Sequence, residues 1–170
     1  MTPCILLMRA QPLHKGHEAL IQQIIDRGYQ PILVLGETIN SVLTERNPWD
    51  YHSRHVMIHH RYPGIPMAKL SDATSWDQWA INLQQVISMV TAVHGEPVIA
   101  LHNKPEDLQS FTFHGIDYID SYYSTIFDVL GVNTINLEPT GINIRATTIR
   151  SDIETNRDYL SEPIYNYIKD

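Results

Sequence analysis

Short apolar runs alternate with longer amphipathic stretches along the chain. Residues 4–8 (CILLM) and 31–35 (PILVL) have the length and composition of buried strands, and Gly36 stops the second of them. Similar runs predict strands at 65–70, 97–101 and 134–137, whereas 111–118 gives only a weak strand signal.

The amphipathic stretches between these runs have helical spacing. Apolar positions within 20–25 would form one face of a helix that Gly28 terminates. Another helix is expected over 51–60, and the clearest one covers about 75–93, where apolar residues recur every three or four positions. Short helices are expected from about residue 147 onward.

Strands that alternate with helices of this length predict βαβ units and a parallel sheet. We therefore expect an α/β fold, a Rossmann-like doubly wound parallel sheet, in a single domain over residues 1–170. In such sheets ligands bind beyond the carboxyl ends of the strands. The turns at that edge are where a functional site is expected.

The composition and charge of the chain argue against several classes of protein. Among the 170 residues, 19 acidic side chains outnumber 12 basic ones, giving a net charge of −7. Nucleic-acid binding usually needs clustered basic charge, so we expect no nucleic-acid partner. We expect no membrane span either, because no apolar run approaches roughly 18 residues. The single Cys4 excludes an internal disulfide and fits a cytoplasmic location.

The first strand-to-helix turn, residues 9–17 (RAQPLHKGH), carries the most chemistry. His14 and His17 are three apart, so they would lie on the same side of a helical turn. Gly16 between them removes a side chain and lets a ligand approach the backbone. With the free N–H groups of a helix start and the flanking basic residues, this turn would form a phosphate site.

Residues 11–17 resemble Q-P-x-H-x-G-H, the signature of the nucleotidyltransferase superfamily with the H-x-G-H motif. The second signature of that superfamily, I-S-x-T-x-x-R, is matched near the C-terminus by Ile144, Thr147 and Arg150. Arg145 stands where the superfamily usually has Ser. The two motifs occur in the family's order, at opposite ends of the strand–helix pattern.

Within this superfamily, the chain is most similar to nicotinamide-nucleotide adenylyltransferases of the archaeal type, which also occur in phages. Residues 46–49 (RNPW) resemble the family's R-[ND]-P-F, and residues 53–57 (SRHVM) resemble E-R-x-x-M. The resemblance implies transfer of AMP from ATP to nicotinamide mononucleotide (NMN), giving NAD and pyrophosphate. It also implies Mg²⁺ held by phosphate oxygens and water, and a homo-oligomer. The NMN phosphate is already a nucleophile, so the site must mainly neutralise and align charge.

On the ATP side, the resemblance implies that His14 and His17 contact the triphosphate and that Arg150 clamps its β- and γ-phosphates. Together with Arg9 and Arg46, these are the predicted catalytic residues. The predicted ATP site comprises Arg9, Gln11, His14, Gly16, His17, Ile144, Thr147 and Arg150.

The predicted NMN site comprises Gly36, Asn47, Asp72, Trp76 and Trp79. Either tryptophan could stack on the cationic nicotinamide ring or pack in the core, and Asp72 could bind the carboxamide or cap a turn. No metal-ligating residue is predicted. His52, His55 and His59 share a helix face, but zinc sites of that kind usually add a Cys or acidic ligand.

Two alternatives stay open. One is another enzyme of the superfamily, a pantetheine-phosphate adenylyltransferase or a cytidylyltransferase, although the cytidylyltransferase segment R-T-x-G-[IV]-S-T-[ST] is missing. The other is a non-catalytic module that senses a nucleotide in the same pocket. Nucleotide binding without pyrophosphate release would distinguish that module from an enzyme.

Overall fold

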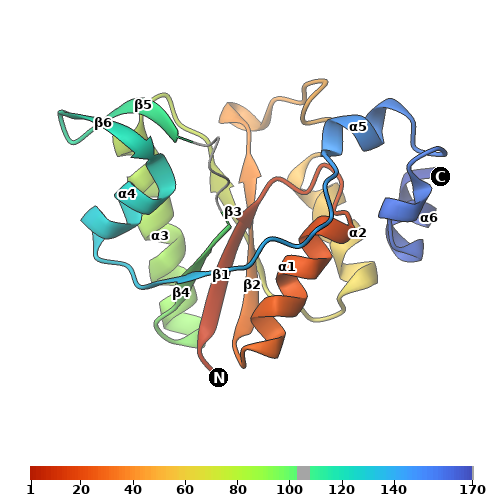
Figure 1. The fold of residues 1–170 in the computed structure, drawn as a ribbon, viewed down its shortest axis with the longest axis horizontal. Helices are drawn as coiled ribbons and strands as arrows, with labels where there is room; N and C mark the ends of the chain where they lie inside the picture. Colours follow the sequence, from red (N-terminus) through yellow and green to blue (C-terminus); the bar gives the residue numbers. More distant parts are fainter. Residues whose placement is uncertain (103–107, 170) are drawn as a thin grey trace.

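A five-stranded parallel sheet with the strand order β3-β2-β1-β4-β7 forms the centre of the computed structural model, which describes residues 1–102 and 108–169 (Figure 1). This order, with β1 in the middle and crossovers to both sides, confirms the predicted doubly wound α/β fold. The strands are β1 (Pro3–Met8), β2 (Gln30–Glu37), β3 (Met67–Ser71), β4 (Val98–Leu101) and β7 (Thr134–Asn136).

Helices cover both faces of the sheet because its strands are apolar on both sides. Along β1, Cys4 and Leu6 face one core and Ile5 faces the other. The helices on the first face are α1 (Lys15–Asp26), α2 (Tyr51–Arg61), α5 (Ala146–Ser151) and α6 (Glu162–Lys169). The second face is covered by α3 (Trp76–His94) and α4 (Tyr122–Leu130). None of the helices in the described part of the chain is long and apolar enough to cross a bilayer.

Three details differ from the sequence expectations. The weak strand signal at 111–118 belongs to a hairpin, β5 (Leu108–Phe113) and β6 (Ile116–Ser121), which turns at His114 and Gly115 with positive φ at both. The helix α4 was not predicted. Gly36 does not stop β2; it pairs with Leu70 inside the β2–β3 ladder.

The carboxyl ends of β1, β2 and β3 lie at the upper edge of the sheet in Figure 1. The long segment between β2 and α2 and the short helix α5 lie at the same edge. It is here, beyond the carboxyl ends, that the predicted site residues are found.

Candidate active site

The two histidines of the first turn build the start of α1. His14 is the N-cap, and its Nδ1 accepts a hydrogen bond from the Gly16 N–H at 3.1 Å. In return, the His14 backbone N–H donates to Nδ1 of His17 at 3.1 Å. The rings stack with their centroids 3.8 Å apart. The pair therefore forms a reciprocal capping box from imidazoles instead of Ser and Glu.

This capping fixes the chemistry of both rings. A neutral imidazole whose Nδ1 accepts a hydrogen bond carries its proton on Nε2. Burial lowers the pKa of His14 to about 4, and it lowers the pKa of His17 well below the usual value, with help from His14 and His102. At neutral pH the turn thus presents two uncharged Nε2–H donors.

Gly16 is also required by the geometry of the cap, a reason that the sequence did not indicate. A Cβ at this position would lie 2.8 Å from Cε1 and 2.9 Å from Nδ1 of His14. The absence of a side chain at Gly16 therefore makes room for the capping imidazole of His14.

The structure brings the two sequence motifs together. Nη1 of Arg150, on α5, donates to the backbone oxygen of Gln11 at 2.7 Å, and Nη2 donates to Oγ1 of Thr147 at 3.3 Å. Burial lowers the pKa of Arg150, and so does the nearby cation of Arg46. Ile144 packs against the core just before this helix. The guanidinium of Arg150 therefore contacts the first turn, and the cation of Arg46 lies near Arg150.

The segment between β2 and α2 is tied to the same turn. The buried amide of Gln11 donates to the backbone oxygen of Trp49 at 2.9 Å and accepts from the Trp49 N–H at 3.1 Å. Asn47 makes a local turn, in which its N–H and side-chain amide both donate to Oγ1 of Thr44. Gln11 is thus a positioning residue in this structure, and the Asn47 side chain supports its own loop.

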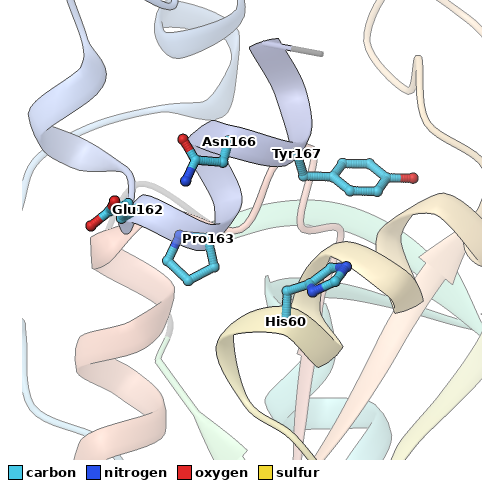
Figure 2. Close-up of a pocket in the computed structure, with 5 residues that line it drawn as sticks. All are labelled: His60, Glu162, Pro163, Asn166 and Tyr167. Carbon is cyan, nitrogen blue, oxygen red and sulfur yellow. The ribbon is translucent and has the colours of Figure 1, made fainter.

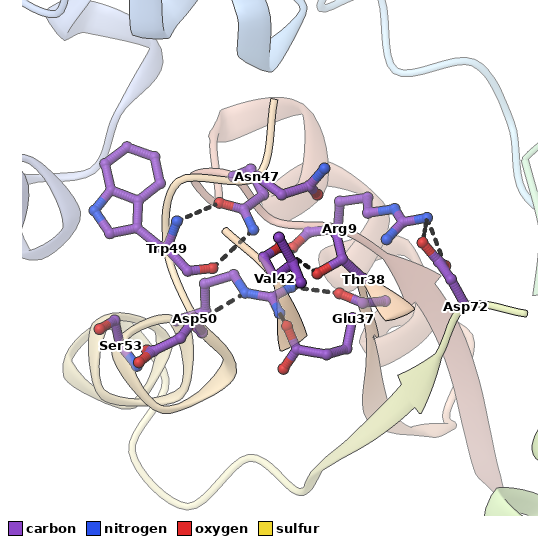
Figure 3. Close-up of polar contacts among 12 residues, drawn as sticks. Arg9, Glu37, Thr38, Val42, Asn47, Trp49, Asp50, Ser53 and Asp72 are labelled. Carbon is purple, nitrogen blue, oxygen red and sulfur yellow. Dashed lines mark hydrogen bonds and ion pairs between the residues drawn. The ribbon is translucent and has the colours of Figure 1, made fainter. Parts of the chain in front are cut away.

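A narrow slot of about 90 Å³ lies at the carboxyl ends of β1, β2 and β3. Its polar wall is an ion pair in which Nη2 of Arg9 lies 2.7 Å and 2.9 Å from the two oxygens of Asp72 (Figure 3). Its aromatic wall is Trp79, which is 8% exposed, and Tyr123. Ligand pockets usually span roughly 300–1,000 Å³, so this slot is too small for a whole nucleotide and could hold only a part of one, such as a single ring.

The predicted NMN residues divide between this slot and its surroundings. Gly36, Asp72 and Trp79 line the slot, whereas Trp76 packs edge-on against Trp79 and does not line it. Trp79 belongs to the core, as one of the two alternatives expected, and it also lines the slot.

Two residues with a place at the site were missed. Tyr123 lies on the unpredicted helix α4, so no pattern pointed to it. Arg54 is 1% exposed and was named only as part of a motif. The sequence did contain a signal for Arg54, because it lies on the same face of α2 as the apolar residues Met57 and Ile58. A cation on a buried helix face is unusual and indicates a specific role.

A larger cavity of about 570 Å³ lies elsewhere, between α2 and α6 (Figure 2). Its lining residues are His60, Glu162, Pro163, Asn166 and Tyr167. None of the predicted site residues is among them, and size alone therefore does not identify the site. Over residues 1–102 and 108–169, no group of three or more His, Cys, Asp or Glu side chains is arranged to hold a metal ion.

No protein-family model matches the chain. An uncharacterized protein of Aeropyrum pernix is 32% identical over 72 residues, which are 41% of this chain and 42% of that protein. Among solved structures, a bifunctional NMN adenylyltransferase/ADP-ribose pyrophosphatase of Francisella tularensis, complexed with AMP and manganese, is 20% identical with a TM-score of 0.74. The match covers 99% of this chain and 48% of that one.

Two further structures have the same architecture. A NadR protein in complex with NAD and AMP-PNP is 15% identical, with a TM-score of 0.66, over 98% of this chain and 46% of that one. The nicotinic acid mononucleotide adenylyltransferase of Plasmodium falciparum, complexed with NaAD, is 15% identical with a TM-score of 0.55, over 99% and 94%. The chain spans about half the length of the Francisella and NadR proteins. At these identities the likeness shows that this chain has the Rossmann-like fold of these proteins.

Proposed function

We propose that the chain transfers AMP from ATP to NMN, giving NAD and pyrophosphate. The observation that carries this proposal is the hydrogen bond from Arg150 to the Gln11 carbonyl, which joins the C-terminal motif to the histidine turn. The fold neighbours act on, or are complexed with, pyridine nucleotides, which adds support. The sequence resembles the archaeal type of this enzyme, and we include that type in the proposal. It rests on the sequence resemblance alone, since the fold neighbours with a stated source come from Francisella tularensis and Plasmodium falciparum.

The chemistry follows from the donors present. An oxygen of the NMN phosphate forms a bond to the α-phosphorus of ATP, while the bond from that phosphorus to the bridging oxygen breaks and pyrophosphate leaves. The nucleophile needs no base. The Nε2–H groups of His14 and His17 would donate to the triphosphate, and Arg150, Thr147 and Arg46 would bind its outer phosphates. Such preorganised donors stabilise charge as it develops in the transition state.

The slot would hold the nicotinamide ring. Trp79 and Tyr123 offer aromatic faces to a cationic pyridinium. Asp72 offers a carboxylate to the same cation or to the carboxamide. Since the slot has only the volume of a ring, the ribose and phosphate of NMN would extend toward the histidine turn.

Mg²⁺ would enter with ATP. The residues proposed for the triphosphate are N–H donors, cations and one hydroxyl, and Mg²⁺ prefers oxygen ligands. It would therefore be held mainly by phosphate oxygens and water. Bound there, it would supply additional positive charge on the phosphates.

The test is an assay of the purified chain with ATP and Mg²⁺ against NMN, nicotinic acid mononucleotide, pantetheine phosphate and glycerol phosphate, with CTP as a second donor. Pyrophosphate and NAD should form with ATP and NMN. His17→Ala and Arg150→Ala should each lower turnover about a hundredfold or more, because one preorganised donor contributes roughly 3 kcal/mol.

The matched control is Arg157→Ala, which removes a guanidinium that lies over the Tyr165 ring in the C-terminal tail. It should leave turnover unchanged. Near-normal turnover in His17→Ala or Arg150→Ala would remove that residue from the mechanism. If the chain binds a nucleotide but releases no pyrophosphate from ATP with any of the acceptors, the sensing module would be favoured.

A further inference from the structure

Arg54 is a buried cation whose hydrogen bonds go mostly to backbone oxygens. Its Nη1 donates to the carbonyls of Arg9 and Gly36, both at 2.7 Å, and its Nε donates to the Asp50 carbonyl at 3.2 Å. Nη2 lies 3.4 Å from Oε1 of the buried Glu37. Figure 3 labels three of the partner residues, Arg9, Glu37 and Asp50. A buried charge is tolerated only with partners of this kind, so the guanidinium is fixed in place.

The two carbonyls mark the point where β1 leaves the sheet. The β1–β2 ladder ends with the pair Met8 and Leu35, while β2 continues along β3 as far as Glu37. Arg9 and Gly36 are the next residues beyond the last β1–β2 pair. Arg54 therefore bridges the two strands just where their own hydrogen bonds stop.

The chain is strained immediately after this bridge. Ala10 has a φ of 53°, in the left-handed region that non-glycine residues rarely adopt. The carbonyl before it accepts from Arg54, and the carbonyl after it, on Gln11, accepts from Arg150. Arg54 thus fixes the backbone on the β1 side of Ala10, and Arg150 fixes it on the side of the histidine turn.

This bridge also sets one wall of the slot. Arg9 lies directly over Gly36, since a Cβ on the glycine would be 3.2 Å from Cδ, Nε and Cζ of Arg9. From that position Arg9 reaches Asp72. A shift of either carbonyl would move the Arg9–Asp72 pair relative to Trp79 on the other wall.

We propose that Arg54 is a positioning residue for the pyridine mononucleotide, acting through the Arg9 and Gly36 carbonyls without touching the substrate. The proposal rests on the proposed function, because it assigns the slot to the acceptor. It predicts an effect on the acceptor side and not on the triphosphate side, which is built from the histidine turn and α5.

The competing interpretation is that Arg54 only neutralises Glu37, and two variants separate the possibilities. Arg54→Met leaves a buried carboxylate without this cation and should lower the melting temperature. Arg54→Met/Glu37→Gln removes both charges and should restore the part of that loss that comes from the unpaired carboxylate. In both variants the KM for NMN should rise about tenfold or more, whereas the KM for ATP should stay within about twofold of the parent, because misplaced positioning groups weaken only the ligand they align.

Arg61→Met is the control, since Arg61 is on the same helix but pairs with Glu18 of α1. It should leave both KM values unchanged. A double variant with restored stability and a parental KM for NMN would overturn the positioning role, as would an equal rise in the KM for ATP. A parent chain that neither forms NAD nor binds NMN in a calorimeter would overturn the proposed function, and this inference with it.

Discussion

Gly16 and His14 show how closely one residue of the turn depends on another. An alanine Cβ at position 16 would overlap the capping imidazole, so Gly16→Ala should displace the His14 ring. The loss of the cap costs about 1 kcal/mol, and the higher helix propensity of Ala offsets it by about 1 kcal/mol. We therefore expect little change in the free energy of unfolding but a fall in turnover of about a hundredfold.

Gly28→Ala provides the opposite case. Gly28 ends α1 with a φ of 83° and has open space around its Cα. Substitution there should lower the free energy of unfolding by about 1 kcal/mol and leave turnover unchanged. Denaturant unfolding and the NAD assay on both variants test this pair, and a Gly16→Ala enzyme as active as Gly28→Ala would contradict the proposed role of His14.

At the scale of an element, the N-terminus of α1 should make stability depend on pH. His14 has a pKa of about 4 in the folded chain, against about 6.5 when unfolded. Between these values the unfolded chain takes up a proton that the folded chain does not, so stability falls as the pH falls through this window. The contribution of His14 is about 3 kcal/mol, present above pH 6.5 and lost toward pH 4. His17 acts in the same direction.

Urea unfolding at several pH values between about 7.5 and 4.5 measures this dependence. His14→Asn is the matched variant, because Asn also accepts hydrogen bonds at an N-cap but does not titrate. Its stability should fall less steeply over the same range. Parallel profiles for the parent and His14→Asn would show that the imidazole is not held neutral.

Sequence patterns predicted some elements and not others for physical reasons. The two strands β1 and β2 are short continuous apolar runs that are buried on both faces of the sheet. In α3 the apolar residues recur at helical spacing, and the buried residues have the same spacing. The hairpin and α4 lie outside the parallel sheet and share a core with α3. The helix α4 has only 9 residues, so its apolar positions give a short signal next to the weak signal of the hairpin. Tyr123 was missed with α4.

The site residues show a similar limit. Motif spacing pointed to the two histidines and to Arg150, but not to the Nδ1 contacts that make both rings Nε2–H donors. The resemblance implied that Arg9 meets phosphates, and Asp72 was expected to bind the carboxamide or to cap a turn; the ion pair between the two side chains was not anticipated. Contacts between residues so far apart in sequence depend on the sheet, which no local pattern encodes.

At the scale of the whole molecule, the doubly wound sheet explains why distant segments share one edge. The β1–α1 turn, the segment after β2 and the start of α5 all lie beyond the carboxyl ends of parallel strands (Figure 1). Arg150 and Gln11 are separated by 139 positions and are joined by a 2.7 Å hydrogen bond. The proposed triphosphate site is thus a product of the topology, and the slot beside it is a product of β1, β2 and β3.

A crystal structure of this chain with NMN and a non-hydrolysable ATP analogue would test that arrangement most directly. The triphosphate should lie between the histidine turn and α5, with Nε2 of His17 and the Arg150 guanidinium both within about 3.2 Å of its oxygens, and with the nicotinamide ring beside Trp79. A triphosphate bound away from either group, or a nicotinamide ring outside the slot, would contradict the account.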